Sequence, residues 1–298
     1  MMTTGTMTET AFMDVQDYID SETAEGETFA RAAEHGPLDV DIEPCPGWDM
    51  RELVRHLGII HLWAAANVAY PKDDWLSVDD LPDLVGQWPE LAAAWPDDTG
   101  LVGWYRACLA NLTRVLSEAP PDHDCFTFLP APTAVTMWSR RQASEIAIHR
   151  FDAEQARDIT TDYEPAFASD MLDELLSGFT PRTRKLDVDR PMTMHVHAAD
   201  TDDHWRVTFG PDRVSTSRHD DDADLVVRAR ATDLYLLFWN RSTQRDIIAD
   251  GDTKILDLWK ENFRVRRVRY QRGTNSRTTR PARAPVLSAA ISPPASTP

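Results

Sequence analysis

The sequence predicts two domains, an N-terminal four-helix bundle and a smaller α+β domain. The chain has 298 residues, which exceeds the usual size of a single domain. Up to about residue 180, apolar side chains recur every three or four positions, as they do in helices. After Pro181, short alternating segments end at Asp, Gly or Pro, which is typical of strands. We therefore expect a disordered start at 1–11, a helical bundle at 12–180, an α+β domain at 181–263 and a basic, disordered tail at 264–298.

Four long helical patterns form the predicted bundle. They cover about 12–35, the stretch that follows Asp49, 101–116 and 133–158. The second pattern opens with a capping box, in which Asp49 caps the helix and Glu52 lies three residues later. This start places His56 on an inward stripe among leucines. A shorter helix is expected at 166–175, and a long connection with a short helix near Leu91 is expected at 71–99.

The second domain is expected to combine strands with two helices. Strands are predicted at 191–198, 204–210 and 223–230, a short strand and turn at 246–251, and helices at 232–240 and 252–263. His195 and His197 alternate with apolar residues on the first strand, so they share one face. No third metal ligand is apparent beside them in the sequence. An exposed face without a metal is therefore the favoured interpretation.

Composition and charge restrict the class of protein. The formal net charge is −18, although eight arginines and no acidic residue follow Glu261. An acidic body repels phosphates, which argues against nucleic acid as the main ligand. The three cysteines lack CxxC spacing, so neither disulfides nor a structural zinc site are expected, and a reducing cytosol fits. The start of the chain lacks a signal-peptide pattern, and no run of about 18 apolar residues could span a membrane. We expect a cytoplasmic protein.

The strongest candidate site lies in residues 138–156. Glu145 and His149 stand four residues apart there, on one face of a helix with many apolar neighbours. A buried carboxylate and imidazole need a partner, and His56 points inward from another helix. Two imidazoles and one carboxylate are a common ligand set for a catalytic divalent metal. The alternative is that Glu145 pairs with His149 or Arg141 and that His56 is a core histidine, and the spacing alone favours this alternative.

The same residues carry a resemblance to a known family. PCPGWDMRELVRHLGIIHLWA and the later RRQASEIAIHRFDAEQA resemble the mycothiol-dependent maleylpyruvate isomerase family, a branch of the DinB-like metal-binding bundles. ADLVVRARATDLYLLFWNR, followed by IIADGD, is similar to that family's second domain, which resembles sterol carrier proteins. The resemblance spans about residues 12–262. Either of the first two segments alone would be weak, but together they are fairly specific.

The resemblance implies a DinB-like bundle, a sterol-carrier-like second domain and a divalent metal, usually zinc, bound by His56, Glu145 and His149. It also implies mycothiol as the thiol cofactor and a small electrophile as the substrate. These fit a metal site, because a metal ion favours the thiolate form of a thiol, and the thiolate is the nucleophile that attacks an electrophile. Arg241 matches the family's basic residue near the thiol, so a catalytic and cofactor-binding role is expected for it. Arg150 flanks the ligands and is a second candidate for cofactor binding.

Two functions remain open at this point. The first is a mycothiol-dependent enzyme, either a thiol transferase or a cis-trans isomerase. The second is a metal-binding or small-ligand-binding protein without turnover, such as a stress sensor or regulator. Two His and one Glu also suit iron, nickel or manganese, so the ligand set does not identify the metal. Many relatives have a His directly before the ligand Glu, whereas this chain has Ser144, which puts the hydrogen bonding around the ligands and the substrate preference in doubt.

Other polar residues have simpler interpretations. Arg140 and Arg141 also flank the ligands and could attract a carboxylated substrate, but ion pairing is favoured for at least two of the three flanking arginines. Cys45 and Cys125 are expected to be inert thiols. The acidic cluster after His219 lacks the Gly and closing Glu of an EF-hand loop, so a solvated turn is expected.

Overall fold

The computed structural model describes residues 12–70, 88, 91, 97–182, 186–241 and 247–263. The predicted disordered ends, at 1–11 and 264–298, and most of the predicted connection at 71–99 lie outside these residues. The chain divides into two compact units, which meet in the sequence between Tyr163 and Glu164. Each unit has its own apolar core. The predicted combination of a helical bundle and an α+β domain is confirmed.

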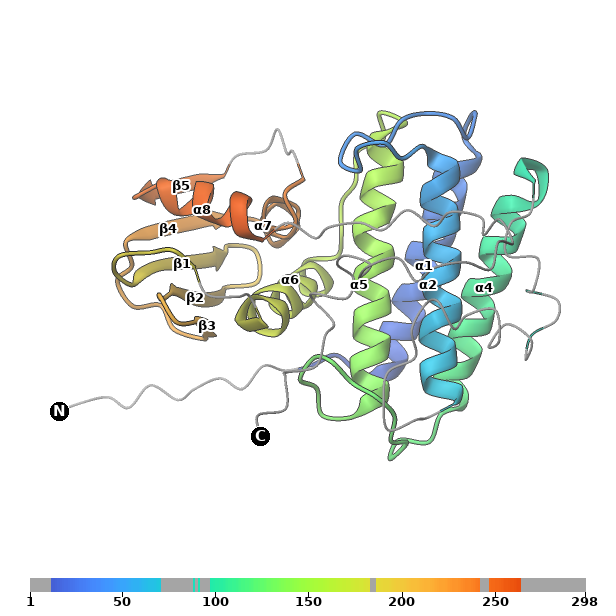
Figure 1. Ribbon diagram of the computed structural model, residues 1–298, viewed down its shortest axis with the longest axis horizontal. Coiled ribbons are helices and arrows are strands. Elements are labelled where there is room, and N and C mark those ends of the chain that lie inside the picture. Colours follow the sequence, from blue (N-terminus) through green and yellow to red (C-terminus); the bar gives the residue numbers. More distant parts are fainter. Residues whose placement is uncertain are drawn as a thin grey trace, which may run out of the picture. The chain divides into compact units, whose positions relative to one another are not determined.

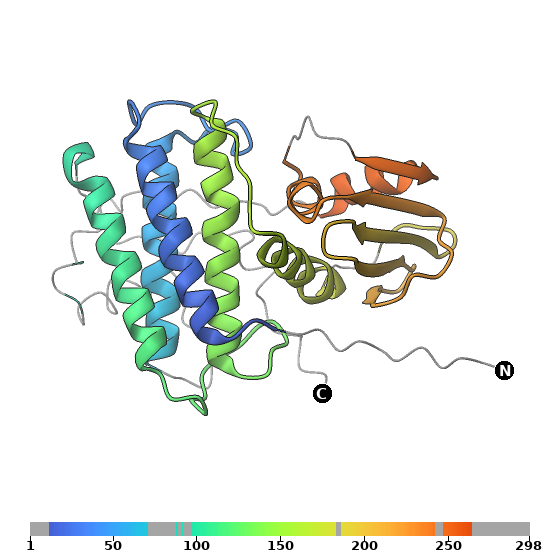
Figure 2. The ribbon, with the colours of Figure 1, turned by 180° about the vertical axis from the view of Figure 1, so that it is seen from behind.

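The N-terminal unit contains four long helices that lie side by side (Figures 1 and 2). They are α1 (Val15–Glu34), α2 (Met50–Ala69), α4 (Asp98–Glu118) and α5 (Ala134–Gln155). Helix α1 packs chiefly against α5, and α2 packs chiefly against α4. The bundle therefore consists of two helix pairs, which meet where α1 lies against α4 and where α2 lies against α5.

Helix α2 begins as predicted. The Asp49 side chain accepts a hydrogen bond from the backbone N–H of Glu52, and the Glu52 carboxylate accepts one from the backbone N–H of Asp49. A backbone bridge between Asp41 and Asp49 fixes the incoming chain. Further along, Gly58 lies against Trp104 of α4, where any side chain would collide with the indole ring. These contacts set the position of α2 against its neighbours and with it the direction of His56.

Helix α5 is almost entirely buried, although much of its surface is polar. Its buried polar side chains include Ser139, Gln142, His149 and Asp152. An ordinary surface helix has one apolar stripe and one exposed polar face. In α5 buried polar groups pair with each other or with another helix, as His149 does with Asp152 and Gln142 with His61 of α2.

The C-terminal unit holds a five-stranded sheet with the order β3-β2-β1-β4-β5. The strands are β1 (Met192–Ala198), β2 (Asp203–Phe209), β3 (Val214–Ser217), β4 (Leu225–Ala229) and β5 (Ile248–Gly251). Strands β1 and β4 are parallel, and the other neighbours are antiparallel. Strand β3 was not predicted, because VSTS is short and lies at the sheet edge with only one buried side chain, Val214. The helices α7 (Ala231–Phe238) and α8 (Lys254–Asn262) lie where predicted.

Helix α6 (Pro165–Asp173) belongs to the C-terminal unit, so the predicted boundary near residue 180 lies too late in the chain. The indole N–H of Trp205 on β2 donates to the Asp173 carboxylate, at 2.8 Å. Thr216 on β3 donates to the backbone carbonyl of Leu176, in the π-helical turn that continues α6 (Glu174–Phe179). Helix α6 also packs against α7. Its amphipathic sequence fits a bundle equally well, which explains the error.

Among the described residues, no helix is long and apolar enough to cross a membrane.

Candidate metal centre

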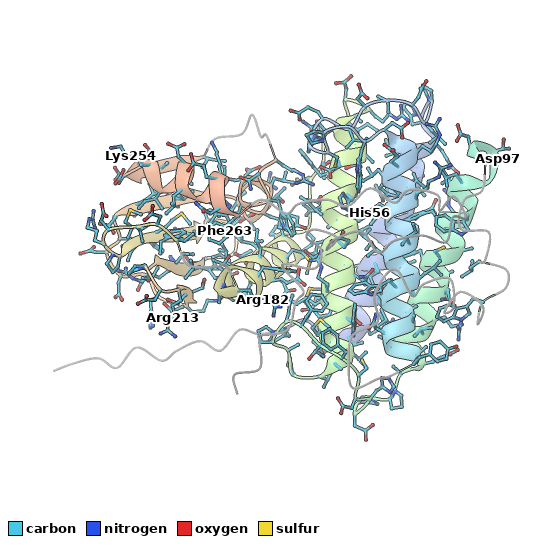
Figure 3. The ribbon with its side chains drawn as sticks, in the orientation of Figure 1. His56, Asp97, Arg182, Arg213, Lys254 and Phe263 are labelled. Atoms are coloured by element: carbon cyan, nitrogen blue, oxygen red, sulfur yellow. The ribbon has the colours of Figure 1, made fainter. Side chains whose placement is uncertain are left out.

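The structure brings His56 of α2 together with Glu145 and His149 of α5 inside the bundle. His56 is labelled on α2 in Figure 3. Its Nε2 atom lies 3.1 Å from Oε1 of Glu145, and Nε2 of His149 lies 3.4 Å from the same oxygen. The two imidazole rings are 5.0 Å apart and nearly perpendicular. One ligand atom from each residue lies within 4.8 Å of the other two. Two ring nitrogens and one carboxylate oxygen therefore face a common point.

Asp152 orients His149. Its Oδ2 atom lies 2.9 Å from Nδ1 of His149 and accepts a longer hydrogen bond, of 3.4 Å, from the thiol of Cys45. An Nδ1–H that donates to Asp152 leaves the Nε2 lone pair directed at Glu145. This is the tautomer that a metal-binding histidine needs. Asp152 is fully buried, so its carboxylate depends on these partners.

Arg141 holds the other oxygen of Glu145. Its guanidinium donates to Oε2, one helical turn away on α5, while Oε1 faces the two imidazoles. Burial opposes ionisation of Glu145, but Arg141, His149 and His56 outweigh burial and keep the pKa of this carboxyl well below its ordinary value. Glu145 is therefore an anion at neutral pH, with one oxygen available as a ligand.

The environment also fixes His56. Its ring lies 4.9 Å from the ring of Trp48, in the loop before α2. Five residues later, His61 is fully buried and its Nδ1 atom lies 3.0 Å from Oε1 of Gln142. Burial lowers the pKa of His61 to about 4, so this imidazole is neutral at neutral pH. His61 belongs to the polar interior of the bundle, outside the three converging ligands.

Two family models cover most of the chain. Residues 19–154 match the mycothiol maleylpyruvate isomerase N-terminal domain, and residues 166–258 match the C-terminal domain of the same family. The chain belongs to the mycothiol-dependent maleylpyruvate isomerase family. The resemblance in the sequence is thus confirmed.

Solved structures share this two-domain fold. The crystal structure of the mycothiol-dependent maleylpyruvate isomerase has a TM-score of 0.54 and 11% identity, and the match covers 80% of this chain and 93% of that one. A variant of that isomerase with one histidine replaced by alanine matches with the same TM-score and coverage, at 10% identity. At this identity the likeness shows the fold alone. No curated protein shows significant sequence similarity to the chain.

The donor set in this member of the isomerase family fits a divalent metal. A tetrahedral ion bound at 2.0–2.1 Å separates its ligand atoms by about 3.3 to 3.4 Å. The distances of 3.1 Å and 3.4 Å from Oε1 of Glu145 to the two imidazoles are close to that separation. The hydrogen bond from Nδ1 of His149 to Asp152 leaves Nε2 free to bind a metal, and Glu145 is ionised, as a metal ligand must be. Ion pairing of Glu145 with Arg141, the alternative interpretation, is also present and is compatible with a metal, because it uses the other oxygen.

The predicted cofactor-binding arginines have structural partners. Arg150 pairs with Glu25 of α1 at 2.6 Å and with Glu154 at 3.0 Å, and its guanidinium packs over the Tyr163 ring. Arg241 is buried in the C-terminal unit just after α7, where it donates to the carbonyl of Trp239. The cofactor-binding roles of both arginines, and the catalytic role of Arg241, stay predictions.

Three other residues singled out in the sequence are buried. Ser144 is fully buried on α5, next to Glu145. Arg140 packs over the ring of Phe12. Cys125 is buried, and burial raises the pKa of its thiol to about 11, so it is a poor nucleophile at neutral pH.

The three converging side chains, and Arg141 as a partner of Glu145, were predicted from the sequence, whereas no orienting role was predicted for Asp152 or Trp48. The signal for Asp152 was present, since it lies three residues after His149 on the same helix face. Cys45 and Trp48 gave no such signal, because only the fold of the loop before α2 brings them to the site.

Proposed function

We propose that this protein is a mycothiol-dependent enzyme that binds a divalent metal, most simply zinc, through His56, Glu145 and His149. The observation that carries the proposal is the convergence of two imidazole nitrogens on one carboxylate oxygen inside the bundle. The family to which the chain belongs supports the thiol. Three protein ligands leave a tetrahedral ion one open position, as in catalytic rather than structural zinc sites.

The metal would supply a positive charge that favours the thiolate form of a thiol at neutral pH. The thiol would supply a nucleophile for an electrophilic double bond. If the thiol leaves again after rotation about that bond, the result is isomerisation, the reaction that the name of the structural relatives gives for maleylpyruvate. If the thiol stays bound to the substrate, the result is transfer. We propose the substrate class as a small, carboxylated electrophile.

The chain's own residues prepare the site. Asp152 keeps the His149 proton on Nδ1, so that Nε2 faces inward. Arg141 holds Glu145 by one oxygen, which favours a single ligand atom from this carboxylate. The Trp48 ring packs beside His56 and limits rotation of the imidazole. These contacts fix the ligands before any metal binds, which reduces the entropy that binding must overcome.

The metal is tested by loading the purified full chain with Zn²⁺ and measuring bound metal by mass spectrometry. His56→Ala and His149→Ala should each weaken zinc binding at this site at least tenfold, because each removes one of three ligands. His35→Ala, at an exposed position at the end of α1, is the control and should leave binding unchanged. Equal zinc affinity in His56→Ala and wild type would contradict the assignment.

The thiol is tested separately, with mycothiol and maleylpyruvate or a panel of other electrophiles. Turnover without loss of free thiol identifies an isomerase, and loss of one thiol per product identifies a transferase. Metal binding without either activity would favour the alternative function, a binding protein without turnover. Activity that survives complete removal of the metal would reject a metal-dependent mechanism.

A further inference from the structure

A second group of histidines lies in the C-terminal unit, on the face of the sheet opposite its apolar core. Strands β1 and β2 pair so that His197 stands directly opposite His204 and His195 opposite Arg206. The alternate residues, among them Val196 and Trp205, are fully buried. Since side chains alternate along a strand, the three histidines share the other face. The sequence showed no third ligand beside His195 and His197, and the pairing of the strands brings His204 onto the same face.

The histidine rings form a compact stack beside an acidic residue. The rings of His197 and His204 are 4.1 Å apart and nearly parallel. Asp202, in the turn that joins the two strands, directs Oδ1 at both rings, 3.1 Å from Nε2 of His197 and 3.4 Å from Nε2 of His204. Asp202 adopts a positive φ of 58°, which Asp tolerates better than most residues. This conformation turns the carboxylate back toward the strands.

We propose that His197, His204 and Asp202 form a second metal site, for a divalent transition metal such as zinc. One ligand atom from each residue lies within 4.8 Å of the other two. The two separations from Asp202 Oδ1 again match the spacing of about 3.3 to 3.4 Å between ligands of a tetrahedral ion. Imidazoles with one carboxylate select zinc, copper or nickel over magnesium or calcium, which prefer oxygen ligands.

His195 serves this site as an orienting partner. Its Nε2 atom lies 2.9 Å from Nδ1 of His204, so the two rings share one hydrogen bond. With the proton on Nδ1 of His204, the Nε2 lone pair of that ring faces Asp202. Histidines that bind metals commonly donate their other ring N–H to an acceptor, which for His204 is the ring nitrogen of His195. His195 is buried and its position is therefore well determined by packing.

The site is open to solvent and its surroundings carry both signs of charge. The Asp202 side chain is 88% exposed, whereas those of His197 and His204 are 18% and 27% exposed. Arg206 and Arg228 lie on the same face as the histidines, and their positive charges weaken the binding of a cation there. Arg206, however, donates to the backbone carbonyls of Asp221 and Asp222, which draws the acidic loop to this face. We therefore expect reversible binding with water in the open positions, weaker than in the bundle.

The inference is independent of the proposed function, because its ligands lie in the other unit of the chain and need no thiol. It is tested on the full chain by titration with Zn²⁺ followed by calorimetry, and with Co²⁺, whose visible absorption reports tetrahedral nitrogen and oxygen ligands. His56→Ala is included so that the bundle site is weakened and the second site is observed alone. In this background we expect one equivalent of zinc to bind.

Two further substitutions identify the ligands. His204→Ala should reduce zinc affinity in the His56→Ala background at least tenfold and abolish the Co²⁺ band. Asp202→Asn should also weaken binding, and it cannot act through misfolding, since the residue is exposed and Asn tolerates the same φ. His35→Ala is the matched histidine control and should have no effect. The proposal is overturned if the His56→Ala chain binds no zinc, or if it binds zinc equally well with and without His204 and Asp202.

Discussion

The Asp152 carboxylate accepts a hydrogen bond from Nδ1 of His149, at 2.9 Å, one turn along the same helix. The contact is buried, so no water replaces it when it is lost. It determines which ring nitrogen of His149 can act as a ligand. A residue that contacts no metal in the proposed site therefore controls how well the site binds one.

Asp152→Asn should weaken zinc binding in the bundle by about 10- to 100-fold, the usual effect of losing such a partner. An amide cannot stabilise the Nδ1–H tautomer as a carboxylate does, so His149 would adopt the other tautomer in part of the population. Affinity is measured by competition with a chromophoric chelator. Asp158→Asn, an exposed change of the same charge at the end of α5, is the control. Unchanged affinity in Asp152→Asn would show that the carboxylate does not orient the ligand.

Glu22→Gln should make the unfolding free energy of the bundle less dependent on pH. Glu22 is fully buried, and neither carboxylate oxygen has a hydrogen-bond partner among the described residues. Burial raises the pKa of Glu22 well above its ordinary value of 4.5. The folded chain therefore keeps a proton that the unfolded chain releases above that value, and stability falls as pH rises toward the folded pKa.

The expected size follows from the linkage of protons to folding. Between pH 4.5 and the folded pKa, stability relative to the Gln variant should fall by up to about 1.4 kcal/mol for each pH unit. Urea unfolding at pH 5, 6, 7 and 8 measures this slope. Glu43→Gln, an exposed control in the same unit, should follow the wild type. If the unfolding free energies of Glu22→Gln and wild type depend on pH in the same way, the buried carboxyl of Glu22 is ionised in the folded chain.

Alanine at two glycines of the bundle should have opposite effects. In Gly58→Ala the new methyl group would lie 2.3 Å from the Trp104 ring, so overpacking should cost about 1–3 kcal/mol. Gly103 on α4 is exposed and has no atom within 4 Å of the added methyl, so Gly103→Ala should stabilise the helix by roughly 0.5–1 kcal/mol. Thermal unfolding of the two variants under one set of conditions measures both. If both variants change the melting temperature in the same direction, the close contact at Gly58 is refuted.

A fragment that starts at residue 164 should fold as an α+β unit, whereas one that starts at 181 should not. The shorter fragment removes Asp173, the acceptor for the buried Trp205 indole, and the carbonyl of Leu176 that accepts from Thr216. An unpaired buried donor costs about 1–3 kcal/mol, and the loss of α6 also exposes its apolar face to water. Near-ultraviolet circular dichroism and urea unfolding distinguish the two fragments. Equally cooperative unfolding would place α6 outside the domain.

The bundle and its three converging side chains were predictable because they follow from local patterns. The Asp49–Glu52 capping box sets where α2 begins and hence the inward direction of His56, and the spacing of Glu145 and His149 needs only a helix. The second histidine group was missed because it depends on register. Nothing local joins His197 to His204, and only the four-residue turn that ends at Asp202 brings them opposite each other. The domain boundary was misplaced because an apolar face, as on α6, does not specify its partner.

The division of the bundle into an α1–α5 pair and an α2–α4 pair has a mechanical consequence. His56 stands on one pair, and Glu145 and His149 stand on the other, so a metal ion bound in the proposed site would link the two pairs of helices. An ion that binds only the closed arrangement stabilises the fold by about 2.7 kcal/mol at 100 times its dissociation constant. The melting temperature of the bundle should then rise with zinc concentration and fall again when a chelator removes the metal.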